Sequence, residues 1–293
     1  MRTTTVRVTV SLLLAAALLA LFLWNVDLES MGRVLLRAHP GPILLSVALA
    51  LLSYWLRAVR WQVILAPVQP VRHSSVVITT AVGYTAMTLL PARLGDLIRP
   101  ILLARRERLP VSASLASILT ERIFDLMLVV ALYLVFVVWP PAMDQLDAAA
   151  EAKLRILGRT GYAMGAGLVV GVLVLIGLFA QQERFVNRLT SPLRALRPAI
   201  AEKVARFLGH FLDGLRVIQR PRQLLLTVAL SAVMWLTIAF QLKASLAAFS
   251  ISMPLRATFL VLTLSILGLA IPTPGGVGGF HAAIQLGLVT FFG

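Results

Sequence analysis

The stretch from Ser112 to Val138 is apolar along its length except for three neighbouring charged residues, Glu121, Arg122 and Asp125. As a helix it would be about 40 Å long, enough to cross the roughly 30 Å hydrocarbon core of a bilayer. A charge near the bilayer centre costs at least about 2.5–3.5 kcal/mol, so ionisable residues there are candidates for function. The alternative is a self-neutralising ion pair that holds helices together.

The composition of the whole chain is that of a membrane protein. Of its 293 residues, 59% are hydrophobic and 13% are charged, and the formal net charge is +15. These values exclude an ordinary soluble domain and predict an all-α polytopic membrane protein. In such a protein, positive charge belongs to loops beside anionic lipid headgroups at the cytoplasmic face, so nucleic acid is not an expected partner.

Apolar segments recur along the chain. They cover about residues 7–25, 41–60, 74–90, 112–138, 161–180, 223–242, 257–271 and 279–292. The first is expected to remain as a membrane helix, because no clear cleavage site follows it. A mixed-charge loop is expected over residues 141–160. The chain reaches Gly293 within an apolar run, which leads us to expect that its C-terminus is clipped.

The positions of the arginines predict the topology. Basic residues gather at the N-terminus and in segments 57–72, 91–110 and 181–222. The positive-inside rule places these regions on the cytoplasmic side of the cell (inner) membrane, with the N-terminus cytoplasmic. This multi-pass topology requires segment 74–90 to enter the membrane and return. The alternative is that the segment spans and the rule fails once.

The second half of the chain contains a similar interruption. Residues 257–271 and 279–292 are each too short to cross the bilayer, and a Pro/Gly stretch separates them. They predict a second re-entrant pair entering from the opposite side, as in inverted-repeat transporters. We therefore expect one transmembrane domain over residues 1–293, with re-entrant segments at about 74–110 and 257–292. Helical spacing of apolar residues over about 196–220 predicts a cytoplasmic amphipathic helix.

Segment 91–99 combines charge with a helix start. Arg93, Asp96 and Arg99 follow Pro91 at intervals of three residues. At a re-entrant tip, arginines and a helix N-terminus would together bind an anion, phosphate above all. The alternative is an interfacial loop whose arginines extend to the membrane surface.

The break at 272–279 offers uncharged groups for the same purpose. Its glycines expose backbone N–H groups that could cradle an oxyanion, and Thr273 adds a hydroxyl. His281 follows the break and could titrate near neutrality. The alternatives are a plain kinked hairpin, and a histidine that only caps or packs.

Enzyme motifs are missing from the sequence. It contains no signature of a metalloprotease, an α/β-hydrolase or a nucleotide-driven pump. It also has no cysteine, and its four histidines lie apart without ligand spacing. We therefore expect no catalytic residues, no metal site and no cofactor.

Three segments in order resemble a known family. Residues 90–99 (LPARLGDLIR), 121–125 (ERIFD) and 272–278 (PTPGGVG) are similar to the signature segments of flippase-like integral membrane proteins. This group is related to the transmembrane domain of lysylphosphatidylglycerol synthase. The resemblance covers nearly the whole chain and implies a helical bundle with re-entrant segments. It implies a lipid-headgroup site lined by Arg93, Asp96, Arg99, Glu121, Arg122, Asp125 and the 272–278 turn, which contains Thr273, Gly275, Gly276 and Gly278.

The chain departs from the family pattern at two positions. The family usually has glutamate where Asp96 and His281 stand. A histidine at 281 removes an expected acidic group and could change the headgroup preference. The family's soluble aminoacyl-transferase domain is absent from this sequence, so lipid aminoacylation is not expected.

The sequence thus predicts a transbilayer lipid transporter, a flippase or scramblase. Its expected substrate is an anionic or zwitterionic membrane phospholipid, a polyprenyl-phosphate or a glycolipid. Assembly as a homo-oligomer stays open. The alternative is a membrane-embedded glycosyltransferase or lipid-modifying enzyme, for which Asp144, Asp147 and Glu151 are the external carboxylates. A non-catalytic partner of such an enzyme is the third interpretation.

Overall fold

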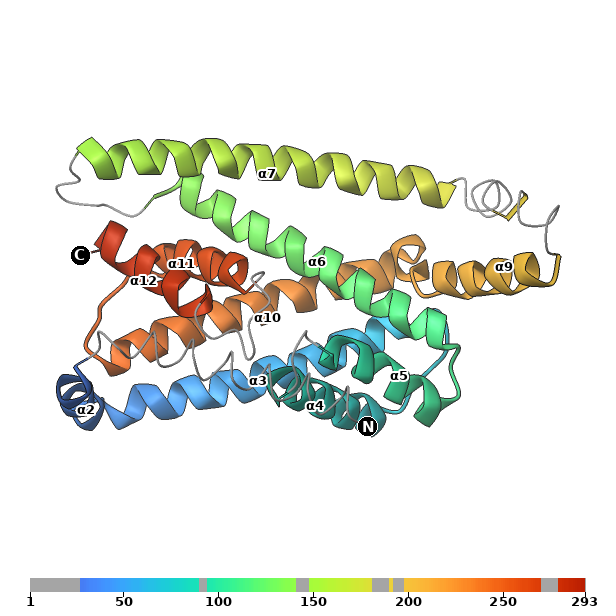
Figure 1. Cartoon of the computed structure of the whole chain (residues 1–293), viewed down its shortest axis with the longest axis horizontal. Helices are drawn as coiled ribbons and strands as arrows, with labels where there is room; N and C mark the ends of the chain where they lie inside the picture. Colours follow the sequence, from blue (N-terminus) through green and yellow to red (C-terminus); the bar gives the residue numbers. More distant parts are fainter. Residues whose placement is uncertain are drawn as a thin grey trace, which may run out of the picture.

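The computed structural model describes residues 27–89, 94–140, 148–180, 190–191, 198–269 and 279–292. These parts of the chain are helical and contain no strand, which confirms the all-α class (Figure 1). The segment predicted at 7–25 lies outside them. The α-helices are α2 (Leu28–Leu36), α3 (Pro40–Leu65), α4 (His73–Leu89), α5 (Gly95–Glu107), α6 (Val111–Val138), α7 (Ala148–Ala180), α9 (Pro198–Asp213), α10 (Pro221–Ala248), α11 (Leu255–Gly268) and α12 (Gly279–Phe292).

Helices α3 and α10 form an antiparallel pair that runs the length of the bundle (Figure 1). At one end the His39 backbone N–H donates to the carbonyl of Ala248 (2.8 Å), and further along Ser46 and Ser245 share a hydrogen bond. Within the described residues, these two helices are long and apolar enough to cross a membrane. Their outward side chains, such as Leu44 and Leu225, are exposed. Exposed apolar faces are expected where lipid surrounds a protein.

Helices α4 and α5 form a hairpin in which the two helices contact each other at both ends. Arg72, just before α4, makes a 3.0 Å ion pair with Glu107, the last residue of α5. At the other end of the hairpin, a Cβ at Gly95 would collide with the carbonyl of Gly83. Glycine at this crossing lets the two backbones approach closely.

Helices α11 and α12 form a second hairpin of the same kind. A Cβ at Gly268 would collide with the backbone of Gly279 and lie 2.8 Å from Cβ of Ala283. Val261 of α11 packs with Ile284 and Leu288 of α12. Both hairpins are therefore closed by glycine at the end nearest their connecting segment.

The two hairpins start at opposite ends of the bundle. Helix α4 follows the C-terminal end of α3, and α11 follows the C-terminal end of α10 (Figure 1). Because α3 and α10 are antiparallel, the hairpins are oppositely oriented. The depth that each reaches in a membrane stays a prediction.

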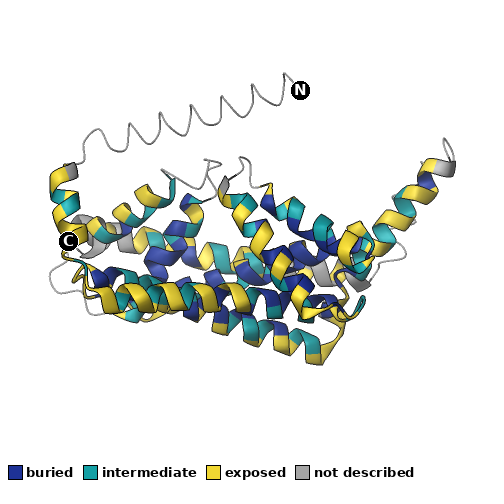
Figure 2. Ribbon diagram, turned by 90° about the horizontal axis from the view of Figure 1, so that it is seen from below, coloured by how far each residue is buried: buried dark blue, intermediate teal, exposed yellow. Residues whose placement is uncertain are grey.

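Helix α6 contacts both hairpins, and α7 packs along its outer side (Figure 1). Figure 2 shows buried residues gathered inside the bundle and exposed residues on its outer faces. The Tyr133 hydroxyl of α6 donates to the carbonyl of Leu157 (2.7 Å), and Gly161 of α7 lies against the same ring. The prediction of a loop over 141–160 is wrong from Ala148 onward. The helix begins there because residues 148–157 (AAAEAKLRIL) are mostly strong helix formers.

Helix α9 and the 3₁₀ turn Arg216–Gln219 occupy most of the segment where an amphipathic helix was expected. Ile200 and Phe207 of α9 are exposed, whereas Ala201 is buried. Gly214 packs against the backbone of Ala113 in α6. Contact of α9 with a membrane surface stays a prediction.

Candidate functional site

A polar stripe runs along one face of α6. Ser114, Ser117, Glu121 and Asp125 are spaced three, four and four residues apart and are all buried. The Ser114 hydroxyl donates to the carbonyl of Pro100 in α5 (2.9 Å), and Ser117 accepts from the indole of Trp61 in α3 (2.8 Å). The serines thus fix α5 and α3 beside the two carboxylates.

Arg60 of α3 joins both carboxylates of this stripe. Its Nη1 donates to Oδ1 of Asp125 (2.7 Å), and its Nη2 donates to Oε1 of Glu121 (2.8 Å). Nη1 also donates to the Ser231 hydroxyl of α10 (3.0 Å). The Arg60 side chain is fully buried. One guanidinium therefore ties α3, α6 and α10 together.

Arg99 of α5 completes the surroundings of Glu121. Its Nη1 donates to Oε2 (2.9 Å), so each oxygen of Glu121 accepts from a different arginine. The Arg99 guanidinium also lies over the Trp61 ring, 3.9 Å from the centroid. Charge-assisted hydrogen bonds and cation–π contact both gain strength away from water.

Asp125 also contacts a residue of α10 and a second arginine of α3, one turn before Arg60. The Trp235 indole donates to its Oδ1 (3.1 Å), and the Arg57 guanidinium lies 3.8 Å from Oδ2. The same guanidinium is 5.5 Å from the Tyr84 ring centroid and 5.9 Å from that of Trp235. Aromatic rings on two helices therefore flank Arg57.

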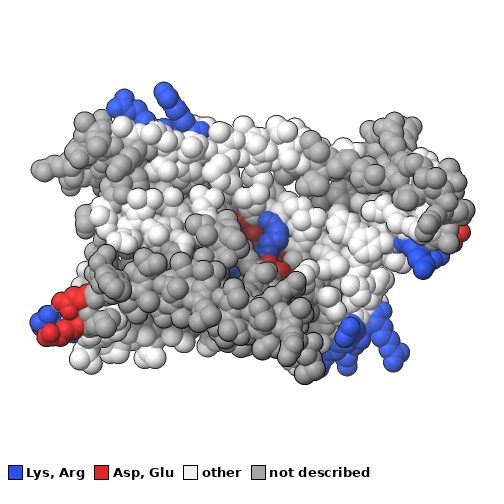
Figure 3. Space-filling view, viewed as in Figure 1, with Lys and Arg blue, Asp and Glu red and all other residues white. Residues whose placement is uncertain are grey.

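Arg122 and Asp96 form the open side of the cluster. Arg122 Nη2 donates to Oδ1 of Asp96 (2.8 Å), and its Nη1 donates to Oδ2 of Asp125 (3.5 Å). The side chains of Arg122 and Asp96 are 39% and 31% exposed. Figure 3 shows basic and acidic atoms together in a hollow near the centre of this face, next to described residues that are uncharged. The cluster is therefore buried on one side and accessible on the other.

Positive charge exceeds negative charge in this cluster, which we call the arginine network. It contains Arg57, Arg60, Arg99 and Arg122 against Asp96, Glu121 and Asp125. Within the described residues, Nε of Arg60 and both Nε and Nη2 of Arg99 are buried without a hydrogen-bond partner. Buried donors usually have partners. Among the described residues, the network therefore has one more cation than anions and has buried donors without acceptors.

The structure brings together five predicted site residues, Asp96, Arg99, Glu121, Arg122 and Asp125. His281 lies in the first turn of α12, with its ring edge-on to that of Phe280. The remaining predicted residues, Arg93, Thr273, Gly275, Gly276 and Gly278, lie outside the described residues.

The site predicted from the sequence did not include Arg57, Arg60, Ser231 or Trp235, although the segment 57–61 also resembles the family. The tryptophans and arginines near residue 60 were assigned to the membrane boundary, whereas α3 continues to Leu65. The usable signal was the three-residue spacing of Arg57 and Arg60, which places both on one helix face.

Residues 8–293 match the family described as the lysylphosphatidylglycerol synthase TM region. The chain belongs to this family. Membership in the lysylphosphatidylglycerol synthase TM region family confirms the predicted resemblance and makes the chain a membrane-embedded domain.

The chain is also similar to a protein of Haloferax volcanii named Glycosyltransferase AglD. The two are 25% identical over 309 residues, which cover 96% of this chain and 48% of that protein. The chain thus spans about half the length of this curated relative. No solved structure matches the chain significantly.

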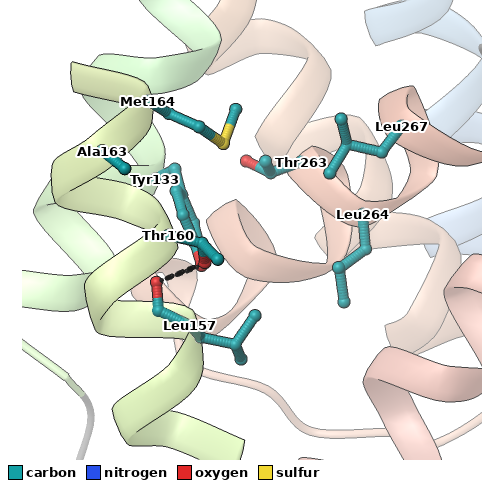
Figure 4. Close-up of a pocket in the computed structure, with 8 residues that line it drawn as sticks. All are labelled: Tyr133, Leu157, Thr160, Ala163, Met164, Thr263, Leu264 and Leu267. Carbon is teal, nitrogen blue, oxygen red and sulfur yellow. Dashed lines mark hydrogen bonds between the residues drawn. The ribbon is translucent and has the colours of Figure 1, made fainter. Parts of the chain in front are cut away.

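A cavity of about 380 Å³ between α6, α7 and α11 is distinct in character from the arginine network. Figure 4 shows Met164 and Thr263 facing each other across it, beside the hydrogen bond between Tyr133 and Leu157. Its lining is almost wholly apolar, and the described residues that form it include no charged side chain. This cavity therefore does not suit an anion.

Proposed function

We propose that this domain moves a lipid with an anionic headgroup between the leaflets of the cell membrane. The observation that carries the proposal is the partly exposed Arg122 guanidinium in a network with one more arginine than carboxylates. Ionisable residues inside membrane proteins mark substrate pathways, and arginine suits phosphate recognition. The apolar surfaces of α3 and α10 place the network among helices suited to span a membrane.

The buried and open parts of the network have different roles in this proposal. Arg60 and Glu121 are fully buried. Together with Arg99 they hold α3, α5 and α6 in position. Arg122 has a partner, Asp96, that is itself accessible, so a lipid phosphate can replace that carboxylate on the guanidinium. Asp96 would then turn to water or to a cationic part of the headgroup. The hydrocarbon tails stay in the surrounding lipid.

The two hairpins give the proposal a route for the headgroup. They approach the bundle from opposite ends, and α6 touches both. In transporters with interrupted helices, the substrate site lies between such elements near the bilayer midplane. Arg93 and the 272–278 turn connect the helices of the two hairpins, and we propose that they complete the site. The N-terminus and the basic loops face the cytoplasm in this arrangement, where anionic headgroups attract them.

An enzymatic function is the second candidate, because AglD carries the name glycosyltransferase. In that case the domain would modify a lipid, or assist a catalytic partner, rather than move it. Of the external carboxylates that the sequence offered, Glu151 lies in the first turn of α7, and Asp144 and Asp147 lie outside the described residues. The network carboxylates all pair with arginines, which favours a binding role over acid–base chemistry.

Reconstitution distinguishes the two candidates. Purified protein is placed in liposomes with headgroup-labelled phosphatidylglycerol, a labelled polyprenyl phosphate, or labelled ceramide without phosphate, and outer-leaflet label is quenched. We expect the quenchable fraction of a phosphate-bearing lipid to rise towards completeness, while ceramide matches protein-free liposomes. The opposite result has two parts: the protein moves neither phosphate lipid, and it transfers sugar from a nucleotide sugar to lipid. That result would contradict transport and support the enzymatic function.

A further inference from the structure

The groove between α3 and α4 carries chemistry that the arginine network does not use. It encloses about 400 Å³, and its lining includes Tyr54 and Trp55 of α3 with Thr80, Tyr84, Thr85 and Thr88 of α4. Tyr54 and Trp55 are about half exposed, so the rim opens to the surroundings of the helix bundle. The Tyr54 and Tyr84 rings meet edge to face at 5.0 Å.

Two buried hydroxyls of this lining lack a partner. Within the described residues, the Thr80 Oγ1 and the Tyr84 hydroxyl make no hydrogen bond, and Thr80 is only 2% exposed. Threonine in a helix commonly bonds the carbonyl one turn earlier, as neighbouring Thr79 does with Ser75 (2.8 Å). An unsatisfied buried hydroxyl is costly. These two hydroxyls therefore have unused hydrogen-bonding capacity.

The groove adjoins the arginine network through Tyr84. The Arg57 guanidinium lies 5.5 Å from the Tyr84 ring centroid and that of Arg99 lies 5.9 Å from it. The described residues that line the groove include no carboxylate. A cationic headgroup in the groove would thus lie near two guanidiniums and would find no carboxylate in the described lining to pair with. Neutral hydroxyls, in contrast, can both donate to and accept from Thr80 and Tyr84. Aromatic rings also suit the C–H faces of a polyol.

We propose that this groove is a second binding site, for the hydroxyl-bearing part of a phosphate-linked lipid headgroup, either glycerol or a sugar. The inference rests on the proposed function and extends it by naming the headgroup chemistry. The phosphate lies at the open side of the arginine network, and its hydroxyl substituent lies against Thr80 and Tyr84. Ethanolamine and other ammonium headgroups are disfavoured at this site.

Binding to the purified full chain tests this site without relying on transport. Native mass spectrometry measures competition between phosphatidylglycerol and phosphatidylethanol, which have the same phosphodiester charge and acyl chains but differ in free hydroxyls. Further arms use phosphatidylethanolamine and a glucosyl phospholipid, the latter separating sugar from glycerol. Wild type is expected to prefer the hydroxyl-bearing lipids, with about a two- to tenfold loss of preference for each hydroxyl removed by Thr80→Val or Tyr84→Phe.

Thr79→Val is the matched control, since that hydroxyl bonds the backbone of its own helix. Thr79→Val should keep the preference for hydroxyl-bearing lipids. Thr80→Ser, which retains a hydroxyl, should show the preference that Thr80→Val loses. Equal binding of phosphatidylglycerol and phosphatidylethanol to wild type would overturn the proposal, as would an equal effect of the Thr79 and Thr80 variants. If wild type keeps the preference but moves no lipid, the transport proposal fails and the groove site stands.

Discussion

At the scale of single residues, Arg60 and Arg122 have opposite surroundings. Arg60 is fully buried and donates to Glu121, Asp125 and Ser231, whereas the side chains of Arg122 and its partner Asp96 are 39% and 31% exposed. Removing one partner of a buried ion pair leaves an uncompensated charge, but removing an exposed one leaves a carboxylate that water can solvate. The two arginines should therefore respond differently to substitution.

Substitution of the buried arginine should destabilise the fold. Arg60→Met leaves two buried carboxylates short of a donor, and we expect a loss of about 3–5 kcal/mol in the free energy of unfolding. Thermal unfolding in detergent measures this, with the exposed Arg206→Met as control. Adding Glu121→Gln and Asp125→Asn to Arg60→Met should recover part of the loss. Equal midpoints for the Arg60 and Arg206 variants would mean that the network does not hold the helices.

The residue pairs show where sequence reasoning reaches its limit. The three-residue spacing of Arg122 and Asp125 indicated a pair, yet that contact is 3.5 Å and the 2.7 Å contact of Asp125 is with Arg60. Helical spacing reports neighbours on one helix only. Arg60 and Asp125 are 65 residues apart, so their contact depends on how α3 packs against α6.

At the scale of helices, glycine determines how closely each hairpin closes. Gly95 and Gly268 face backbone atoms of their partner helices, whereas a Cβ at Gly167 of α7 would meet no neighbouring atom within 4 Å. A side chain at either crossing must separate two backbones. The same residue type is thus constrained at two sites and free at a third.

Valine at either crossing should destabilise its hairpin. We expect Gly95→Val and Gly268→Val each to cost about 1–3 kcal/mol through overpacking, and Gly167→Val to be tolerated. Unfolding midpoints in detergent compare the three variants. Tolerance of all three would contradict the close crossings.

Helix positions were largely predictable, because apolar runs and Pro/Gly breaks mark them directly. The segment 112–138 and the helix Val111–Val138 differ by one residue, and the expected end of 279–292 is reproduced in α12. Helix ends beside charged residues were less predictable, as at Leu65 and Ala148. At Leu65 the sequence favoured an earlier boundary, but packing of Arg57 and Arg60 inside the bundle extends the helix.

At the scale of the whole molecule, the opposite orientation of the two hairpins predicts which residues share a side of the membrane. The chain has no cysteine, so a single introduced cysteine is its only thiol. We expect Arg105→Cys and Arg220→Cys to react with a membrane-impermeant thiol reagent from the cytoplasmic side. Ile251→Cys should react from the other side.

The exposed residue Leu94, which precedes α5, tests how deep the first hairpin reaches. If α4 and α5 re-enter, Leu94→Cys should resist the reagent applied on the side that labels Ile251→Cys. Labelling of Leu94→Cys from that side would show that α4 spans. Labelling of Arg105→Cys and Ile251→Cys from one side would contradict the arrangement of the whole bundle.

Transport by an Arg122 variant tests whether the arginine network binds the lipid headgroup. Arg122→Gln should fold, because Asp96 is accessible and Asp125 keeps Arg60 and Trp235 as donors. The matched control is Arg206→Gln in α9, whose side chain is 66% exposed. In liposomes with labelled phosphatidylglycerol or polyprenyl phosphate, we expect Arg122→Gln to slow transfer by about tenfold or more, since a charge-assisted hydrogen bond contributes roughly 1.5–3 kcal/mol. Transfer by Arg122→Gln at the rate of Arg206→Gln and wild type would contradict a headgroup site at the arginine network.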